Sequence, residues 1–267
     1  MLPIHIGSAD QPLLGLYHPP ATAQGREAVL ICGPWGNEHV SSYRCLAQMG
    51  QQLSAKGYPV LRFDYRGTGD SWGGVDAISV EGWVEDIHTA AEELRATSGC
   101  DRLIVLGLRL GASLAFLAAN KQLQASRLML WEPIINGHDY LETLVKRHRD
   151  KMIQKNRYRT DDNQLNIEPD GHLFGFSCSD DFMKDVSKID LLNCHKPAVS
   201  ELQVIGEFEN IMQPLAARLQ DDDSDITVDL YPVKTGRNWD ELAVLSLGFF
   251  PQPAMQEIQQ LLMGSEP

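Results

Sequence analysis

The middle of the chain changes abruptly from an apolar run to a run of small residues. Residues 103–112 read LIVLGLRLGA, in which Leu103–Leu106 is typical of a buried strand and Gly111 opens a helical stretch. Gly107 and Gly111 enclose three residues, and glycines there permit a sharp turn that projects the central side chain, Arg109. A strand, a tight turn and a helix in direct succession predict a parallel sheet with helices on its faces.

The rest of the chain repeats this alternation of short apolar runs with apolar residues at helical spacing. It shows no internal repeat that would indicate a solenoid or a propeller. We therefore predict an α/β fold with a mostly parallel sheet of about eight strands, begun by a hairpin and covered by helices on both faces. The expected strands are Ile4–Ile6, Leu13–Tyr17, Ala28–Cys32, Pro59–Phe63, Leu103–Leu106, Leu128–Trp131, Ser200–Ile205 and Ile226–Tyr231.

The alternation fails over residues 138–195. This segment is polar and charged, with a basic part, Lys146–Arg159, followed by acidic residues. We interpret it as a helical insertion that forms a lid over the sheet. The expected organisation is thus a single domain, residues 1–267, with a lid-like insertion at about 138–195.

Composition limits the classes of partner. The formal net charge of -13 argues against binding to nucleic acid or to an anionic membrane surface, because phosphate would be repelled. The chain begins without a secretory pattern, and no apolar run approaches the ~20 residues that span a bilayer. Five cysteines without a Cys-x-x-Cys pair are typical of reduced thiols. We expect a cytoplasmic protein without membrane insertion, metal or other cofactor.

Two segments together carry a resemblance to a known family. The first is the turn Gly107-Leu108-Arg109-Leu110-Gly111, and the second is RFDYRGTGDS at residues 62–71. With both, the chain resembles the α/β-hydrolase superfamily, in particular the serine-aminopeptidase-like bacterial branch that includes hydrolases associated with exosortase systems. The resemblance extends from about Leu13 to Leu262 and is strongest over Ala28–Ala119. It implies an α/β-hydrolase fold in which the turn is the nucleophile elbow, G-x-S-x-G.

The resemblance assigns the three catalytic positions, and two of them are not filled. Arg109 stands where the nucleophilic serine should be, and Glu209 matches the acid. The histidine is expected in or near Lys234–Leu242, yet no histidine follows His195. A guanidinium has no hydroxyl to acylate and stays protonated, so it replaces neither nucleophile nor base. We therefore predict that Ser-His-Asp hydrolysis is absent.

The same resemblance places the oxyanion hole. The backbone of Leu110 should supply one N–H, and the Pro34-Trp35 turn should supply the other. Because proline has no N–H, Trp35 is the candidate in that turn. Trp35, Arg44 and Trp131 are the expected substrate-binding residues.

Arg109 has two interpretations. It is either a structural cation that plugs the old site, held by Glu38 or Glu132, or a guanidinium that clamps an anionic ligand. We favour a buried Arg109–Glu132 ion pair, with Arg44 paired to Glu38. Glu38, His39 and Glu132 are the surviving acid–base candidates.

Three functions remain open. The favoured one is a pseudo-hydrolase that binds a small anionic or acyl ligand, alone, as a homodimer or with a biosynthetic partner protein. The alternative is an enzyme with altered chemistry, a non-covalent hydrolase, lyase or cyclase of an ester, thioester or acyl substrate. It would use Arg109 with Glu38, His39 or Glu132. The least favoured is a hydrolase with a relocated nucleophile, such as Cys32 or Ser41.

Overall fold

The computed structural model describes most of the chain. The residues it describes are all except 23–25, 122, 155–170, 208–211, 221–225, 235–238, 240–249 and 264–267.

The described strands of the main sheet confirm the sequence prediction of a mostly parallel sheet. Eight of them lie in the order β1-β2-β4-β3-β5-β6-β9-β10. The pairs from β4 to β10 are parallel, whereas β2 pairs antiparallel with β1 and β4. The bounds are β1 Leu2–Ile6, β2 Leu13–His18, β3 Glu27–Cys32, β4 Val60–Phe63, β5 Arg102–Leu108, β6 Arg127–Trp131, β9 Glu201–Gly206 and β10 Thr227–Pro232.

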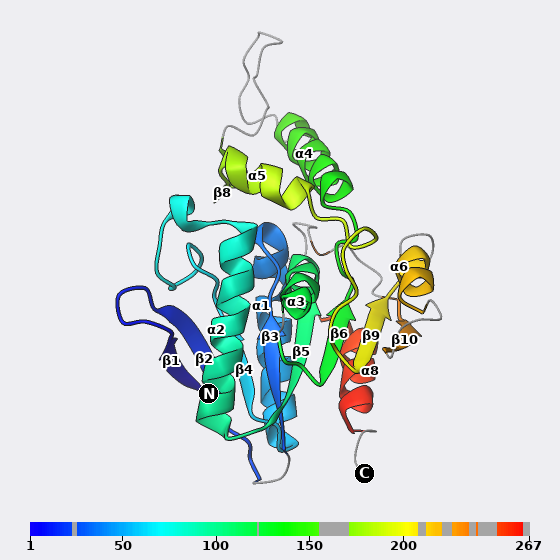
Figure 1. The fold of residues 1–267 in the computed structure, drawn as a ribbon. Coiled ribbons are helices and arrows are strands. Elements are labelled where there is room, and N and C mark those ends of the chain that lie inside the picture. The colour runs from blue at the N-terminus through cyan, green and yellow to red at the C-terminus, as the bar shows by residue number, and fades with distance from the viewer. Residues whose placement is uncertain are drawn as a thin grey trace.

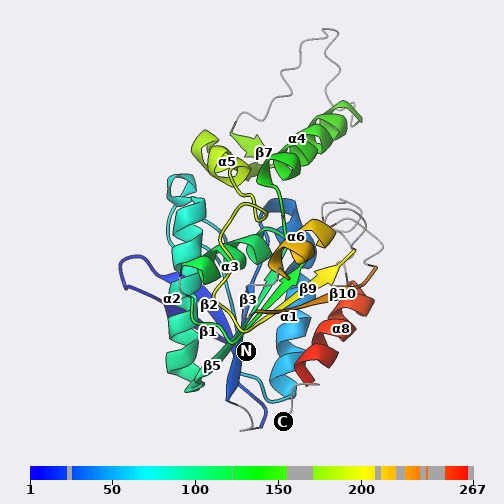
Figure 2. The ribbon, with the colours of Figure 1, turned by 45° about the vertical axis from the view of Figure 1, so that its right-hand side comes forward.

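Helices cover both faces of this sheet (Figures 1 and 2). Helices α2 (Val80–Ser98) and α3 (Leu110–Asn120) lie on one face, and α1 (Gly36–Ala55) and α8 (Gln252–Met263) lie on the other. Helix α6 (Met212–Leu219) follows β9, and a short 3-10 turn, η1 (Val75–Ala77), precedes α2.

Two buried clusters hold the helices to the sheet, one on each face. Along β3, Leu30 belongs to the cluster beneath α2 and α3, whereas Val29 and Ile31 belong to the cluster beneath α1 and α8. Successive side chains of a strand point to opposite faces, so both sets must be apolar when both faces are covered. This is why the central strands read as unbroken apolar runs in the sequence.

The segment between β6 and β9 lies beyond the carboxyl ends of the parallel strands, at the top of Figure 1. Its elements are α4 (Gly137–Gln154), the short strands β7 (His172–Leu173) and β8 (Phe176–Ser177), and α5 (Asp180–Ser187). Gly137 begins α4 where the helix meets α5, and its N–H donates to the Ile189 carbonyl at 2.8 Å. A Cβ at this position would overlap the Val186 carbonyl oxygen.

None of the helices in the described part of the chain is both long enough and apolar enough to cross a bilayer.

Candidate active site at the β5–α3 turn

The turn between β5 and α3 is sharply bent, and Arg109 stands at its apex. Arg109 has φ 54° and ψ −123°, in a region that residues other than glycine seldom adopt. The bend is tight because Gly107 and Gly111 have no side chain. A Cβ on Gly107 would overlap Ala112, and one on Gly111 would overlap the Cys32 and Gly33 carbonyls. The strand–turn–helix context predicted from residues 103–112 is therefore present.

The Arg109 guanidinium forms an ion pair with Glu38 from the first turn of α1. Its Nε and Nη2 both lie 3.0 Å from Glu38 Oε1, and Nη1 donates to the Glu132 carbonyl at 3.3 Å. The Arg109 side chain is 23% exposed, and that of Glu38 only 4%. Burial alone would lower the pKa of Arg109, but the charges of Glu38 and Glu132 outweigh it and raise the pKa further. Arg109 is thus a fixed cation.

A tyrosine from the β6–β9 segment completes this cluster. The Tyr140 hydroxyl of α4 donates to Glu38 Oε2 at 3.1 Å, and the Arg109 guanidinium carbon lies 5.8 Å from the centre of the Tyr140 ring. Glu38 therefore receives hydrogen bonds from both the turn and α4. These contacts join three elements that are distant in sequence.

The partner of Arg109 differs from the one we favoured. The expected Arg109–Glu132 ion pair is replaced by Arg109–Glu38. Glu132 has φ 47°, contributes its carbonyl to Arg109, and accepts at Oε2 from Trp239 Nε1 at 3.0 Å. The expected Arg44–Glu38 pair is also replaced, because Arg44 lies exposed on α1 while the Glu38 side chain points inward.

The two residues expected at the oxyanion hole lie at helix starts. Leu110 is the first residue of α3, and Trp35 directly precedes α1. The first N–H groups of a helix have no acceptor within it. Both backbones are therefore at places where an N–H donor is available.

Trp131, expected to bind substrate, is a core residue. It ends β6, is fully buried in the cluster beneath α1 and α8, and packs edge-on against Trp239 with ring centres 5.2 Å apart.

The two candidates for a relocated nucleophile, Cys32 and Ser41, are both buried. Burial raises the pKa of the Cys32 thiol to about 12, which suppresses the reactive thiolate. The Ser41 hydroxyl donates to the Asn37 carbonyl at 2.9 Å. A further hydroxyl near the turn, that of Ser113 in α3, is also buried: it donates to the Ile134 carbonyl and accepts from the Ile134 N–H, both at 2.8 Å, and so holds the chain after β6 onto α3.

A cavity of about 390 Å³ opens beside this turn, between the β3–α1 loop, the β4–α2 loop and β8. Its walls are largely aromatic, and Tyr65 stacks on Trp83 with ring centres 5.0 Å apart. Polar side chains come from His39, Asp64, Thr68 and Ser177. Arg109 is not among the lining residues. The aromatic lining residues are Trp35, Phe63, Tyr65, Trp83 and Phe176.

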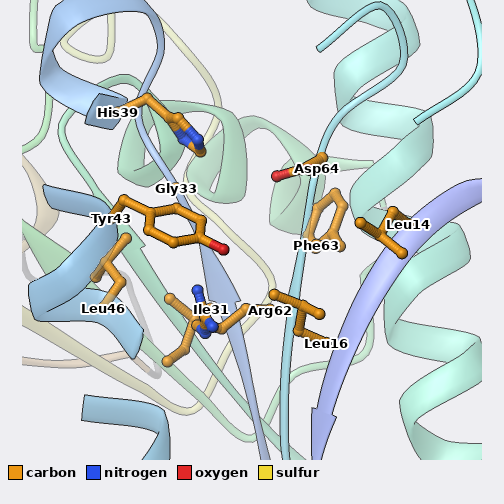
Figure 3. Close-up of a pocket in the computed structure, with 10 residues that line it drawn as sticks. All are labelled: Leu14, Leu16, Ile31, Gly33, His39, Tyr43, Leu46, Arg62, Phe63 and Asp64. Carbon is orange, nitrogen blue, oxygen red and sulfur yellow. The ribbon is translucent and has the colours of Figure 1, made fainter. Parts of the chain in front are cut away.

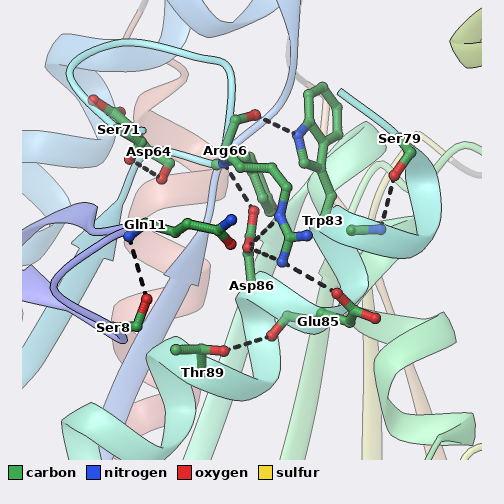
Figure 4. Close-up of polar contacts among 12 residues, drawn as sticks. Ser8, Gln11, Asp64, Arg66, Ser71, Ser79, Trp83, Glu85, Asp86 and Thr89 are labelled. Carbon is green, nitrogen blue, oxygen red and sulfur yellow. Dashed lines mark hydrogen bonds and ion pairs between the residues drawn. The ribbon is translucent and has the colours of Figure 1, made fainter. Parts of the chain in front are cut away.

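Hydrogen bonds fix the loop that forms one wall of the cavity (Figure 4). The Asp86 carboxylate of α2 accepts from the Arg66 backbone N–H and from Arg66 Nε, each at 2.8 Å. Trp83 Nε1 donates to the Arg66 carbonyl at 3.0 Å. Asp64 accepts from the Asp70 N–H at 3.3 Å, and its carbonyl accepts from the Ser71 hydroxyl at 2.5 Å. The RFDYRGTGDS segment is thus a rigid turn.

Sequence reasoning did not assign Asp64, Trp83 or Phe176 to a ligand site. The RFDYRGTGDS segment carried the family resemblance but no site prediction, and the apolar spacing of residues 80–94, which includes Trp83, is typical of a helix face that packs in the core. Phe176 comes from the β6–β9 segment, where no period indicated which residues face the sheet. Only the position of Asp64, at the carboxyl end of a strand, was a usable signal.

Two expected features fall outside the described residues. Glu209 is one of them, and most of the region Lys234–Leu242, where the histidine was expected, is the other. Within the described residues, no group of three or more His, Cys, Asp and Glu side chains is arranged to hold a metal ion.

Comparison with known proteins agrees with the fold. Among solved structures, the chain is similar to Est1E from Butyrivibrio proteoclasticus, solved with ferulic acid, with a TM-score of 0.66, 13% identity and 98% of each chain covered. It is also similar to the Pyrococcus furiosus esterase Pf2001, with a TM-score of 0.61 and 16% identity, over 98% of this chain and 90% of that chain. A third is XC6422 from Xanthomonas campestris, described as an α/β serine hydrolase without lid, with a TM-score of 0.56 and 18% identity, over 100% and 96%.

Identities this low show a shared fold and not a shared activity. No curated protein matches the chain in sequence. Residues 25–198, more than half of the chain, match the sequence model of the family described as serine aminopeptidase, S33. The chain therefore belongs to the serine aminopeptidase S33 family and has the α/β-hydrolase fold of its structural relatives.

Proposed function

We propose that this protein is a pseudo-hydrolase, which keeps the hydrolase fold and a ligand cavity but forms no acyl-enzyme. One observation carries the proposal: the side chain at the apex of the elbow is a guanidinium held by Glu38. Arg109 replaces the nucleophile, so the acyl group of a substrate has no atom to which it can transfer.

The rest of the catalytic machinery supports the same conclusion. The sequence contains no histidine after His195, so the base of a Ser-His-acid triad has no candidate in the C-terminal part of the chain. Among the described residues, Cys32, Ser41 and Ser113 are buried and cannot present a nucleophile at a strained turn.

The ligand that this cavity suits best is a small molecule with an apolar body. Arg109 already has a carboxylate partner, which argues against the anionic ligand that we considered from sequence. The aromatic walls of the 390 Å³ cavity favour an acyl or aryl group instead. Gly175, Phe176 and Ser177 contribute to the lining. We interpret the β6–β9 segment accordingly as a lid on a single domain of residues 1–267.

Labelling with a fluorophosphonate probe tests this proposal directly. We expect no labelling and no turnover of p-nitrophenyl acetate or butyrate, under conditions in which an active serine esterase reacts fully. Arg109→Ser should also fail to react, because a serine alone has no base beside it. Stoichiometric labelling of the unmodified protein would refute the proposal. Ester turnover without labelling would instead support an enzyme with altered, non-covalent chemistry.

A further inference from the structure

Tyr140 attaches helix α4 to the body of the protein at the β5–α3 turn. Its hydroxyl donates to Glu38 Oε2 at 3.1 Å, and its ring centre lies 5.8 Å from the Arg109 guanidinium carbon. Arg109 in turn lies 3.0 Å from the other carboxylate oxygen of Glu38. Glu38 and Tyr140 are buried, and a hydrogen bond to a charged group contributes more than one between neutral groups. This contact is therefore a strong attachment of α4.

Helix α4 holds the β7–β8 hairpin in turn. The Phe174 N–H donates to His148 Nδ1 at 3.1 Å, and the two rings pack edge-on with centres 5.3 Å apart. Lys151 Nζ lies 4.5 Å from the centre of the Phe174 ring. Phe174 has φ 55°, a left-handed backbone that a bulky residue seldom adopts. Such a conformation persists only where the surroundings hold it, and here α4 supplies those contacts.

The hairpin forms one wall of the 390 Å³ cavity, through Gly175, Phe176 and Ser177. The start of α1 forms another wall. A Cβ on Gly36 would lie 4.0 Å from Phe176 Cδ2, so the two walls approach each other closely. Contacts that hold the hairpin therefore also set the width of the cavity at this point.

The first turn of α1 joins this cavity wall to the attachment of α4. Gly36 and His39 line the cavity, and Glu38 lies between them in sequence. His39 and Asp64 also line a smaller pocket, which Figure 3 shows and which shares these walls with the cavity. One turn of α1 therefore contacts the cavity with His39 and α4 with Glu38.

From this chain of contacts we infer that Arg109, Glu38 and Tyr140 form a latch, which keeps α4 and the β7–β8 hairpin closed on the ligand cavity. Tyr140 and His148 are positioning residues, since they act on the hairpin and do not line the cavity. The inference rests on the proposed function, because it assigns a means of controlling access to the cavity of the pseudo-hydrolase. It concerns opening of the lid, so its failure is separable from the labelling experiment above.

Helix α5 provides a second attachment, and it is apolar. Phe182 is fully buried and packs edge-on against Trp35 and Trp83, with ring centres 5.1 and 4.9 Å apart. This contact does not involve the latch. We therefore expect α5 to stay on the sheet when the latch opens, while the hairpin moves.

Hydrogen exchange of the variant Tyr140→Phe tests the latch, because the variant removes one hydroxyl and keeps the ring. Exchange of the amides in residues 172–178 should become about tenfold faster, the effect of one hydrogen bond to a charged group, while α2 and α3 stay unchanged. Tyr58→Phe is the matched control. It removes a hydroxyl that donates to the Leu262 carbonyl at 2.6 Å, and it should leave the hairpin unchanged. Unchanged exchange of the hairpin in Tyr140→Phe, or equal acceleration in α2 and α3, would overturn the inference.

The variant His148→Phe tests the order of the contacts. It keeps a ring against Phe174 but removes the acceptor of the Phe174 N–H, so the hairpin amides should exchange faster while those of residues 140–146 do not. Tyr140→Phe should accelerate both. The same pattern of exchange in the two variants would contradict the assigned order.

A neutral fluorescent probe, N-phenyl-1-naphthylamine, tests the effect on access. By stopped-flow fluorescence, Tyr140→Phe should take up and release the probe about tenfold faster, with the dissociation constant changed less than about threefold, because a gate alters both rates together. Unchanged rates, or weaker binding without faster uptake, would overturn the role of the latch in access. If the unmodified protein did not bind the probe, the ligand cavity of the proposed function would be contradicted, and hydrogen exchange would still decide on the latch.

Discussion

Arg109 combines a strained backbone with a buried charge. A residue other than glycine at φ 54° and ψ −123° costs roughly 1–3 kcal/mol, and the fold must hold it there. The carbonyls of Cys32 and Gly33 approach Gly111 so closely that the bend cannot relax. The ion pair with Glu38 then fixes the side chain above this bend.

Separating this pair should destabilise the protein strongly. Arg109→Met leaves Glu38 buried without its cation, and we expect a loss of about 3 kcal/mol in the free energy of unfolding, measured by urea denaturation. The double variant Arg109→Met/Glu38→Leu should recover part of this loss, since it removes both charges.

Arg102–Glu27 supplies a matched control. This pair also has an N–O distance of 3.0 Å, but the Arg102 side chain is 55% exposed. Arg102→Met should therefore cost less than about 1 kcal/mol. Two outcomes would show that the buried pair is not coupled as described. One is an equal loss in the free energy of unfolding for Arg109→Met and Arg102→Met, and the other is a loss in Arg109→Met/Glu38→Leu equal to the sum of the two single losses.

At the scale of elements, the junction of α4 and α5 depends on a single glycine. Gly137→Ala would push its methyl group against the Val186 carbonyl, so we expect a loss of about 1–3 kcal/mol. Hydrogen exchange should show faster exchange of the α4 and α5 amides with little change in the strands. Glu142→Ala, on the exposed face of α4, is the control and should change neither. Uniformly faster exchange across the sheet would show that α4 and α5 do not open separately.

The strands and main helices could be predicted from sequence because each has a clear physical signature. Strands buried on both faces, such as β3 and β5, are continuous apolar runs, and α2 has a regular apolar stripe. The β6–β9 segment lacks such a period. Its helix α4 packs mainly on α5, and the strands β7 and β8 have only two residues each. The sequence therefore predicted a helical insertion in this segment but not its individual elements.

The site was predictable in outline but not in its contacts. The position of Arg109 at the turn follows from two glycines, which act locally. The ion-pair partner of Arg109 could not be predicted in this way. Glu38 and Glu132 both follow strands that end at the same edge of the sheet, and only the packing of the helices decides which carboxylate reaches Arg109. Glu38 is selected because α1 starts beside the turn and Tyr140 holds its second oxygen.

For the whole molecule, buried neutral histidines should make folding sensitive to acid. His18 is the clearest, since it packs against Gly50 and accepts a hydrogen bond from Arg62 Nε. Burial first, and then the Arg62 charge, lowers the pKa of His18 from 6.5 to about 4. The unfolded chain therefore binds a proton at a higher pH than the folded one. The free energy of unfolding is fully retained above about pH 6.5 and falls as pH decreases toward about 4.

Urea denaturation at a series of pH values measures this effect. The share of His18 is on the order of 3 kcal/mol across that window. His18→Gln keeps an acceptor for Arg62 but does not titrate, so its stability should decline less steeply. His39 and His148 also have pKa values lowered by burial and act in the same direction, so some slope remains. If the free energy of unfolding of His18→Gln fell with pH as steeply as that of the unmodified protein, His18 would not contribute to the acid sensitivity.

Under the proposed function, the Arg109–Glu38 pair also has an evolutionary consequence. A change of Arg109 to serine would leave the Glu38 carboxylate buried without its cation, and the new hydroxyl would have no histidine after His195 to activate it. A serine nucleophile could therefore arise at this turn only by way of a less stable protein. The pair makes that route costly, whereas the cavity, which Arg109 does not line, can change its ligand without disturbing the pair.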